Sequence, residues 1–263
     1  MPSAYFHSSN ANALLRYGFR LAKGGAHTSR TMMRTELECL LRAVPEAAPD
    51  SAYSEAVVEQ NALGKDTVSS RKKSFAHLRD LYGLSSQIPL FSALRILHRL
   101  SPDSIAPLAC LAVLARDPLL RATSDAVLSR TEGHAVSPAD LIPALEKEFP
   151  SVYSPKSLLS IAQNCASSWA QAGLLQGKAR KTRVHPMPSP AACVFAFLLG
   201  EVTGHHGAAV FSSPWCRALD LDSDGARRQG FEAHRNGWIN LRAIGDVVEI
   251  GFPCLPESLV HSA

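Results

Sequence analysis

Apolar residues recur every three or four positions between Ser154 and Gly173, and this period predicts an amphipathic helix. Ser154 followed by Pro155 is a start signal, and Gly173 suits the left-handed position that ends a helix. The buried face is expected to hold Leu158, Ile161, Ala162, Cys165, Trp169 and Ala172. The opposite face carries polar side chains and no acid: Lys156, Ser160, Gln163, Asn164, Ser167 and Gln171.

The segments on either side of this helix predict a winged helix-turn-helix. A serine-proline start signal at Ser137 predicts a preceding helix that ends near Phe149. After Gly173, Leu174–Leu175 and Thr182–Val184 are typical of two short strands joined by a turn, which would form a wing. The wing carries the cations Lys178, Arg180, Lys181 and Arg183.

A helix able to enter a groove beside a basic hairpin is the arrangement that duplex DNA binding needs. Phosphate contacts supply affinity, and base-edge contacts supply specificity. We therefore expect contacts with double-stranded DNA from the four wing cations and from Lys156, Ser160, Gln163, Asn164 and Ser167. Winged helices also dock proteins, so the alternative is a scaffold whose winged helix binds another subunit.

A second helix-turn-helix candidate lies in the N-terminal part of the chain. Helices are expected at residues 13–21, from Thr28 or Ser29 to before Pro45, at 54–61 and at 67–82. The last two are separated by a turn, and Phe75, Leu78 and Tyr82 would face inward. The outer side would carry Ser74 and the candidate DNA contacts Ser70, Arg71, Lys72, Lys73 and His77. The competing interpretation is a solvated basic face.

The remaining helices and one hairpin are predicted from the same signals. Helices are expected at 90–100, 104–116, 118–129, 191–203, 213–219 and 224–235. The helix at 104–116 is apolar nearly all round, so it should be the centre of a bundle. Residues 238–242 and 247–252, joined at 244–246, predict a terminal β-hairpin.

A polar stretch at residues 131–134 is the best candidate for a domain boundary. It would divide the chain into a helical domain, 1–132, and a winged-helix domain, 133–263. The predicted fold class is mainly α: a helical N-terminal bundle with a helix-turn-helix, followed by a winged-helix domain with a helical extension and a C-terminal β-hairpin.

Positive charge is segregated along the chain, although the net charge is only +4. Residues 1–35 contain five Lys or Arg and no acid, and residues 149–200 contain the same. The rest of the chain carries 17 basic and 23 acidic residues. Basic patches of this kind are expected of a protein that meets a polyanion.

Other features argue against membrane and enzyme classes. The longest apolar runs, 105–115 and 191–199, are too short to cross about 30 Å of hydrocarbon, so we expect no membrane partner. The six cysteines lack CxxC spacing, which favours reduced thiols in a cytoplasmic protein. Residues Asp220–Gly225 resemble the start of a calcium-binding loop. The twelfth position of that loop, which must supply a bidentate carboxylate, is Phe231, so we expect no calcium site. No catalytic motif occurs, so we expect no enzyme activity, cofactor, metal or small-molecule substrate.

Four stretches carry a loose family signature: Asn61 to Lys73, Leu111 to Arg121, Tyr153 to Leu175, and Trp238 to Phe252. Together they resemble the BrxA family, small subunits of the BREX bacteriophage-defence systems. The likeness extends from about residue 10 to 253 and includes no catalytic motif. It implies a soluble, mostly helical, non-enzymatic DNA-binding protein that acts beside the other BREX subunits.

Overall fold

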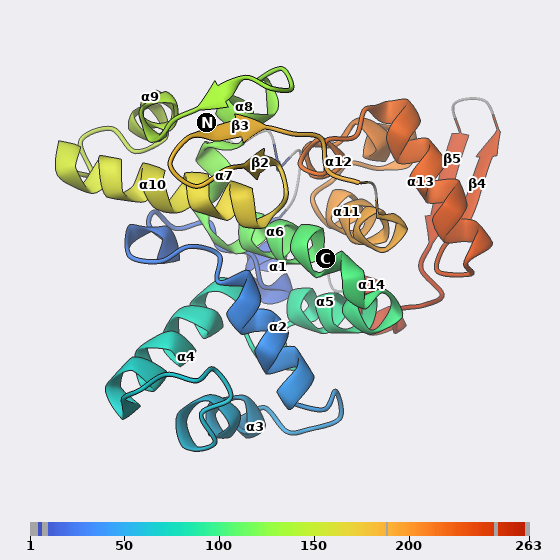
Figure 1. Ribbon diagram of the computed structural model, residues 1–263. Coiled ribbons are helices and arrows are strands. Elements are labelled where there is room, and N and C mark those ends of the chain that lie inside the picture. The colour runs from blue at the N-terminus through green and yellow to red at the C-terminus, as the bar shows by residue number, and fades with distance from the viewer. Residues whose placement is uncertain (1–4, 7–9, 188, 245–246, 261–263) are drawn as a thin grey trace.

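The computed structural model describes residues 5–6, 10–187, 189–244 and 247–260, which form a mainly helical structure with small antiparallel sheets (Figure 1). The first helices are α1 (Ala11–Tyr17), η1 (Ala26–Thr28), α2 (Arg34–Ala43), α3 (Ser51–Ser54), the π-helical η2 (Glu55–Glu59), α4 (Val68–Tyr82), α5 (Pro89–Leu100), η3 (Pro102–Ser104), α6 (Ile105–Arg116), α7 (Pro118–Ala122) and α8 (Ser124–Leu128). They are followed by β1 (Ala135–Val136), α9 (Pro138–Glu148), α10 (Pro155–Gln171), β2 (Leu175–Gln176), β3 (Lys181–Arg183), α11 (Pro190–Val202), η4 (Gly207–Ser212), α12 (Pro214–Arg217), α13 (Ser223–Arg235), β4 (Asn240–Ile244), β5 (Val247–Gly251) and α14 (Glu257–Val260).

Helix α6 lies at the centre of the fold, as its apolar sequence predicts. From Leu108 to Ala115 its residues are at most 1% exposed. Helices α2, α4, α5, α7, α10 and α11 all contact it. Because α10 and α11 follow residues 131–134, helices from both predicted domains pack on the same central helix. The division of the chain at that point stays a prediction.

Helix α11 is the second buried helix, and it contacts α5, α6, α12 and α13. Within the part of the chain that the structure describes, no single helix is long and apolar enough to cross a membrane. Together, α11 and the segment Gly207–Arg217 meet the length and composition criteria, but the two are bent by 120° to one another.

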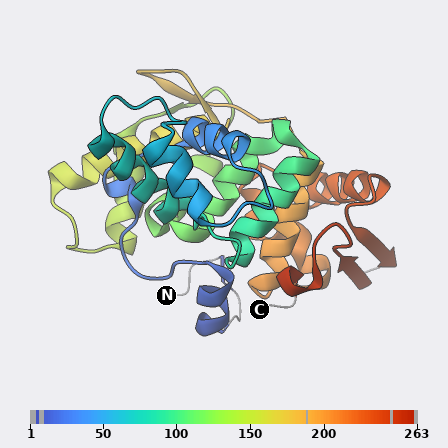
Figure 2. The same cartoon turned by 90° about the horizontal axis from the view of Figure 1, so that it is seen from below.

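A small sheet in the order β1–β3–β2 holds the predicted wing. Leu175 pairs with Arg183, and Ala135 of the additional strand pairs with Thr182. In Figure 2 the hairpin of β2 and β3 projects from the body of the molecule. Strand β1 was not predicted, because two residues are too few to show an alternating pattern.

The helices beside this sheet begin and end where the sequence predicted. Ser137 and Asp140 form a capping box at α9, and the Ser154 hydroxyl accepts a hydrogen bond from the Ser157 N–H at 3.2 Å at the start of α10. Gly173 follows α10 with a φ of 86°, a left-handed conformation that a glycine adopts without strain.

Two N-terminal helix boundaries were predicted wrongly. Helix α1 ends at Tyr17, not near Leu21, because Gly18 has a φ of 114° and closes the helix with its N–H. Helix α2 begins at Arg34, not at Thr28 or Ser29. The residues between η1 and α2 form no helix, and Met33 there has a left-handed φ of 53°. The N–H groups of Met32 and Arg34 bond to side chains of α10, which compensates for the missing helical hydrogen bonds.

The predicted helix at 118–129 is divided into α7 and α8 at Thr123. The Thr123 hydroxyl donates to the Leu120 carbonyl at 2.7 Å and so competes with the regular helical pattern. The terminal hairpin is confirmed, with Asn240 paired to Gly251 and Ile244 paired to Val247. Its predicted turn at residues 245–246 lies outside the described residues.

The contact between α13 and α11 gives a test of the packing. A Cβ atom on Gly230 would lie 2.9 Å from Cε2 of Phe197, whose ring is buried and stacks edge-on against Phe211. We expect Gly230→Ala to destabilise the protein by about 1 kcal/mol, because overpacking outweighs the higher helix propensity of alanine. Thermal unfolding measures the effect as a melting temperature lower by about 2–4 °C.

Gly251→Ala is the matched control for this substitution. Its added Cβ would lie 3.6 Å from the Asn240 side chain, an ordinary van der Waals distance. The control should therefore melt close to the wild-type temperature. Equal melting temperatures for Gly230→Ala and the wild type would show that α11 and α13 are packed more loosely than described.

Candidate nucleic-acid interface

The buried face of α10 fixes how the helix is rotated in the fold. Each of its six predicted core residues is at most 5% exposed: Leu158, Ile161, Ala162, Cys165, Trp169 and Ala172. The Trp169 indole N–H donates to the Thr123 hydroxyl at 2.8 Å, so the polar atom of the largest side chain is also satisfied. This rotation determines which polar side chains of α10 face outward.

The segment Gly24–Arg34, which we call the strap, covers one flank of the polar face of α10. In Figure 1 α10 lies between the small sheet above it and η1 of the strap below it. The Asn164 amide donates to the His27 carbonyl at 2.9 Å. The Gln171 side chain accepts from the Arg34 N–H at 3.0 Å and donates to the Thr31 hydroxyl at 2.9 Å. Asn164 was predicted to contact DNA, but its amide is used to hold the strap.

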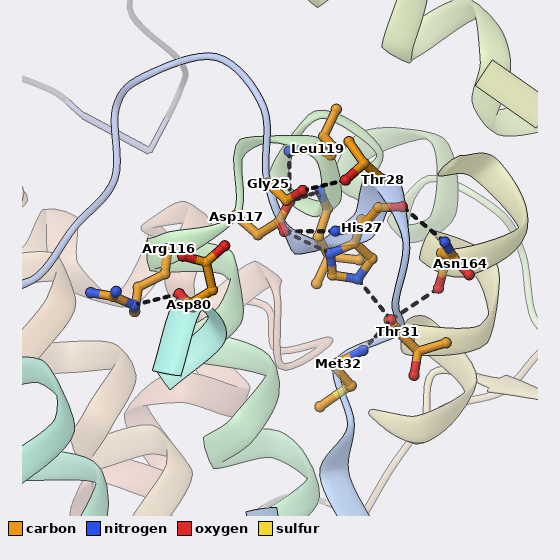
Figure 3. A network of polar contacts seen from close by, with 12 residues as sticks. Gly25, His27, Thr28, Thr31, Met32, Asp80, Arg116, Asp117, Leu119 and Asn164 are labelled. Atoms are coloured by element: carbon orange, nitrogen blue, oxygen red, sulfur yellow. Dashed lines mark hydrogen bonds and ion pairs between the residues drawn. The ribbon is translucent and has the colours of Figure 1, made fainter. Parts of the chain in front are cut away.

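A buried polar network fastens the strap to α7 and α10 (Figure 3). His27 Nδ1 lies 2.9 Å from Asp117 Oδ2, and His27 Nε2 lies 2.8 Å from Ser168 Oγ. The Ser168 hydroxyl also accepts from the Met32 N–H at 2.8 Å and lies 2.9 Å from the Asn164 carbonyl. The network therefore links residues far apart in the sequence through short polar contacts.

Several hydrogen-bond donors replace the water that the buried Asp117 carboxylate loses. It accepts the N–H groups of His27, Leu119 and Leu120, two of which belong to the first turn of α7. Burial raises the pKa of Asp117, but the His27 imidazole and these hydrogen bonds outweigh it and hold the pKa below its usual value. A Cβ on Gly25 would lie 2.4 Å from Oδ1 of Asp117, so the close approach requires glycine there.

Asp117, His27 and Ser168 form a chain of contacts from carboxylate to imidazole to hydroxyl, as the catalytic residues of serine hydrolases do. Here, however, His27 and Ser168 are 0% exposed and Asp117 is 1% exposed. The Ser168 oxygen already has partners in the strap and in its own helix. A substrate carbonyl has no route to that oxygen, so we assign the network a structural role.

The side chains of α10 that remain exposed form a stripe at its N-terminal half. Lys156, Leu159, Ser160 and Gln163 are exposed, and Ser167 is half-buried. These positions are three or four residues apart and so share one face. Leu159, which is 44% exposed, was not expected among the polar residues of this face. The Ser160 hydroxyl donates to the Lys156 carbonyl at 3.2 Å, so it is partly occupied within the helix.

The tip of the hairpin between β2 and β3, which follows α10 in the chain, carries exposed cations. Lys178 and Arg180 are exposed, and Lys181 is half-buried with its ammonium 2.9 Å from the Lys178 carbonyl. Gly177 has a φ of 111°, and a Cβ there would lie 2.1 Å from the Arg180 carbonyl oxygen. Glycine is therefore required for the tight turn that presents the cations.

Arg183 does not contribute to this exposed charge, which corrects the sequence prediction. Its side chain is 0% exposed and forms an ion pair with Asp220. The guanidinium also donates to the carbonyls of Leu174 and Val184, and His185 contacts the same carboxylate. A buried cation must be paired in this way, because an isolated one would cost several kcal/mol. Arg183 thus anchors the base of the hairpin.

The second candidate helix, α4, is confirmed, with Thr67 and Ser70 in a capping box. Two of its predicted outer residues point elsewhere. Arg71 donates to the Val58 carbonyl at 2.8 Å at the end of η2, and Ser74 is 7% exposed. The predicted surface cations that remain are Lys72 and Lys73, which are both exposed.

Arg30 is an exposed cation on the strap that the site prediction missed. Burial and then the Arg30 guanidinium lower the pKa of the His77 imidazole of α4. The strap contacts both α10 and α4 through η1, and Arg30 lies two residues after η1. The acid-free composition of residues 1–35 was the signal that pointed to this segment.

No protein-family model matches the chain, and no curated protein is similar to it.

The lowered pKa of Asp117 predicts a pH-dependent contribution to stability. Because the folded pKa lies below the unfolded value of about 3.9, the carboxylate stabilises the fold fully above that value. The contribution disappears as the pH falls through the folded pKa. We expect Asp117→Asn to lower the free energy of unfolding by about 3 kcal/mol at pH 7, and by progressively less between pH 5 and 3.

Urea unfolding of both proteins across this pH range measures the difference. Asp125→Asn is the control, because the Asp125 side chain is 82% exposed and its ion pair with Arg217 lies at the surface. The control should match the wild type at every pH. A constant difference between Asp117→Asn and the wild type would contradict the assigned charge state.

Proposed function

We propose that this protein binds double-stranded DNA, with α9, α10 and the sheet of β1, β2 and β3 acting as a winged helix. The observation that carries this proposal is the exposed, acid-free stripe of α10 together with the cationic tip of the hairpin that follows the helix. Helix α10 has no acidic residue, and neither does the chain from 149 to 200. Within α10 and the hairpin there is no carboxylate to repel phosphate, and the α10 N-terminus itself favours an anion.

The dimensions of these elements suit a duplex. A single α-helix fits the B-DNA major groove, which is about 12 Å wide. The hairpin would then follow the backbone with Lys178 and Arg180 at phosphates, while Lys156 neutralises a phosphate near the start of α10. Site residues on a helix held by a buried network are already positioned before DNA arrives, which lowers the entropic cost of binding.

The resemblance to the BrxA family supports a biological setting for this activity. We propose a non-enzymatic, cytoplasmic accessory subunit of a BREX-type bacteriophage-defence system, which binds DNA beside the other subunits. Nothing in this role needs a cofactor, a membrane or a small-molecule substrate.

A protein-docking scaffold is the second candidate, and one observation favours it. Leu159 and Val152, at 44% and 43% exposed, are apolar side chains on or just before α10. Apolar surface of this kind is also used to bind protein partners. The two candidates differ in their response to salt, because only phosphate neutralisation must weaken steeply as salt increases.

The hairpin tip is tested with Lys178→Ala combined with Arg180→Ala. We expect weaker DNA binding and a slope of log affinity against log salt that is shallower by about 1.8, or about 0.9 for each phosphate that is no longer neutralised. The melting temperature should not change, since both side chains are exposed. Fluorescence anisotropy with a labelled duplex over a salt series gives the slope.

Arg228→Ala combined with Arg235→Ala removes the same charge from exposed positions of α13. This control should keep the wild-type slope. If both double variants lose affinity equally, the effect is one of net charge and the hairpin is not part of the interface.

The surface of α4 is tested with Lys72→Ala combined with Lys73→Ala, leaving Arg71 in place because it bonds to η2. The strap contacts both α10 and α4, so we expect DNA bound at α10 to reach α4 across the strap. The salt slope should again become shallower by up to about 1.8, with unchanged base preference. A wild-type slope would confine DNA binding to α10 and the hairpin.

A further inference from the structure

We propose that α10 recognises A·T base pairs, with Gln163 bonding to the adenine edge and Leu159 packing on the thymine methyl group. This inference rests on the proposed function, since it requires α10 to enter the major groove. Gln163 would then select adenine, and Leu159 would select thymine.

Tertiary contacts leave only part of the polar face of α10 available to bases. The strap occupies Asn164, Ser168 and Gln171, so these polar side chains of α10 are not available to a base. Helix α10 therefore offers bases the exposed residues of its N-terminal half and the half-buried Ser167. Among the exposed residues there, Lys156 lies in the first turn, where a cation meets the backbone, and the Ser160 hydroxyl bonds to a carbonyl of its own helix.

The Gln163 side chain can form the hydrogen bonds that recognise adenine. Its amide offers one acceptor and two donors, which match the N6 donor and N7 acceptor of adenine in a bidentate pair. Within the described residues, the Gln163 amide has no hydrogen-bond partner, whereas the amides of Asn164 and Gln171 are both bonded to the strap. It is thus the exposed amide on this helix that is free to bond a base.

Leu159 has the chemistry that distinguishes thymine from the other bases. It is 44% exposed and is flanked on the stripe by polar side chains, so part of its apolar surface remains in water. In the major groove, the thymine C5-methyl is the apolar group that such a side chain can bury. Leu159 and Val152 are each only partly exposed, and together they offer less than the several hundred Å² expected of a protein-docking patch.

The spacing of the two residues fits neighbouring base pairs. Leu159 and Gln163 are four residues apart, so their Cβ atoms lie about 5–6 Å from each other on one face. The rise between base pairs is about 3.4 Å, so the two side chains reach the same or the adjacent pair. The expected site is therefore short and contains adjacent A·T pairs.

The experiment starts from sites selected by the wild-type protein out of a random duplex pool. The strongest site is then made twice, once with thymine and once with deoxyuridine, which lacks only the methyl group. We expect enrichment of A·T pairs and about fourfold weaker binding of the deoxyuridine duplex, the effect expected for one buried methyl group.

Substitutions test whether Leu159 contacts the thymine methyl group and whether Gln163 bonds to adenine. In Leu159→Ala, the thymine and deoxyuridine duplexes should bind equally. Gln163→Ala should weaken the selected site at least about tenfold while leaving binding to unrelated duplexes nearly unchanged. Lys156→Ala is the control, because removing a phosphate-binding cation should weaken every duplex by the same factor. All three positions are exposed, so melting temperatures should stay close to the wild type.

Selected sites without A·T enrichment, or equal wild-type affinity for thymine and deoxyuridine duplexes, overturn this inference and leave DNA binding itself standing. A thymine preference that persists in Leu159→Ala also overturns it. If Leu159→Ala changes no DNA affinity at all, the inference fails and the exposed leucine is explained by the docking alternative. Absence of any duplex binding by the wild type removes the proposed function, and this inference with it.

Discussion

The buried contact between His27 and Asp117 is the interaction on which the arrangement of the candidate interface depends. A carboxylate in the core destabilises a fold unless partners replace its hydration. Asp117 has the imidazole and three N–H groups as partners, and Ser168 extends the same network to α10. Removing one member would leave buried polar groups unpaired, so the strap is held to both α7 and α10.

This constraint decides which part of α10 a ligand can reach. A helix in isolation exposes its whole polar face, but here the strap takes the C-terminal half of that face. The exposed stripe that remains is short and contains one free amide and one leucine. The strap also adds an exposed cation of its own, Arg30.

A second buried ion pair has a comparable effect on the hairpin. Arg183 and Asp220 join the end of β3 to the segment between α12 and α13. The pair removes one cation from the exposed surface and fixes the direction of the hairpin. The charge that remains at the tip comes from Lys178, Arg180 and Lys181, whose side chains lie outside the core. Exposed lysines and arginines contribute little to stability, so they are available for binding.

The sequence by itself determined the parts of the structure that depend on local signals. The core face of α10, its ends at Ser154 and Gly173, the hairpin after it and the apolar α6 follow from period, capping and turn residues. Only the tertiary structure decided that Asn164 holds the strap, that Arg183 is buried and that Arg71 bonds to η2. The partners that decide these three cases, His27, Asp220 and Val58, belong to other elements of the fold, and no local pattern of polar residues distinguishes such an internal partner from solvent.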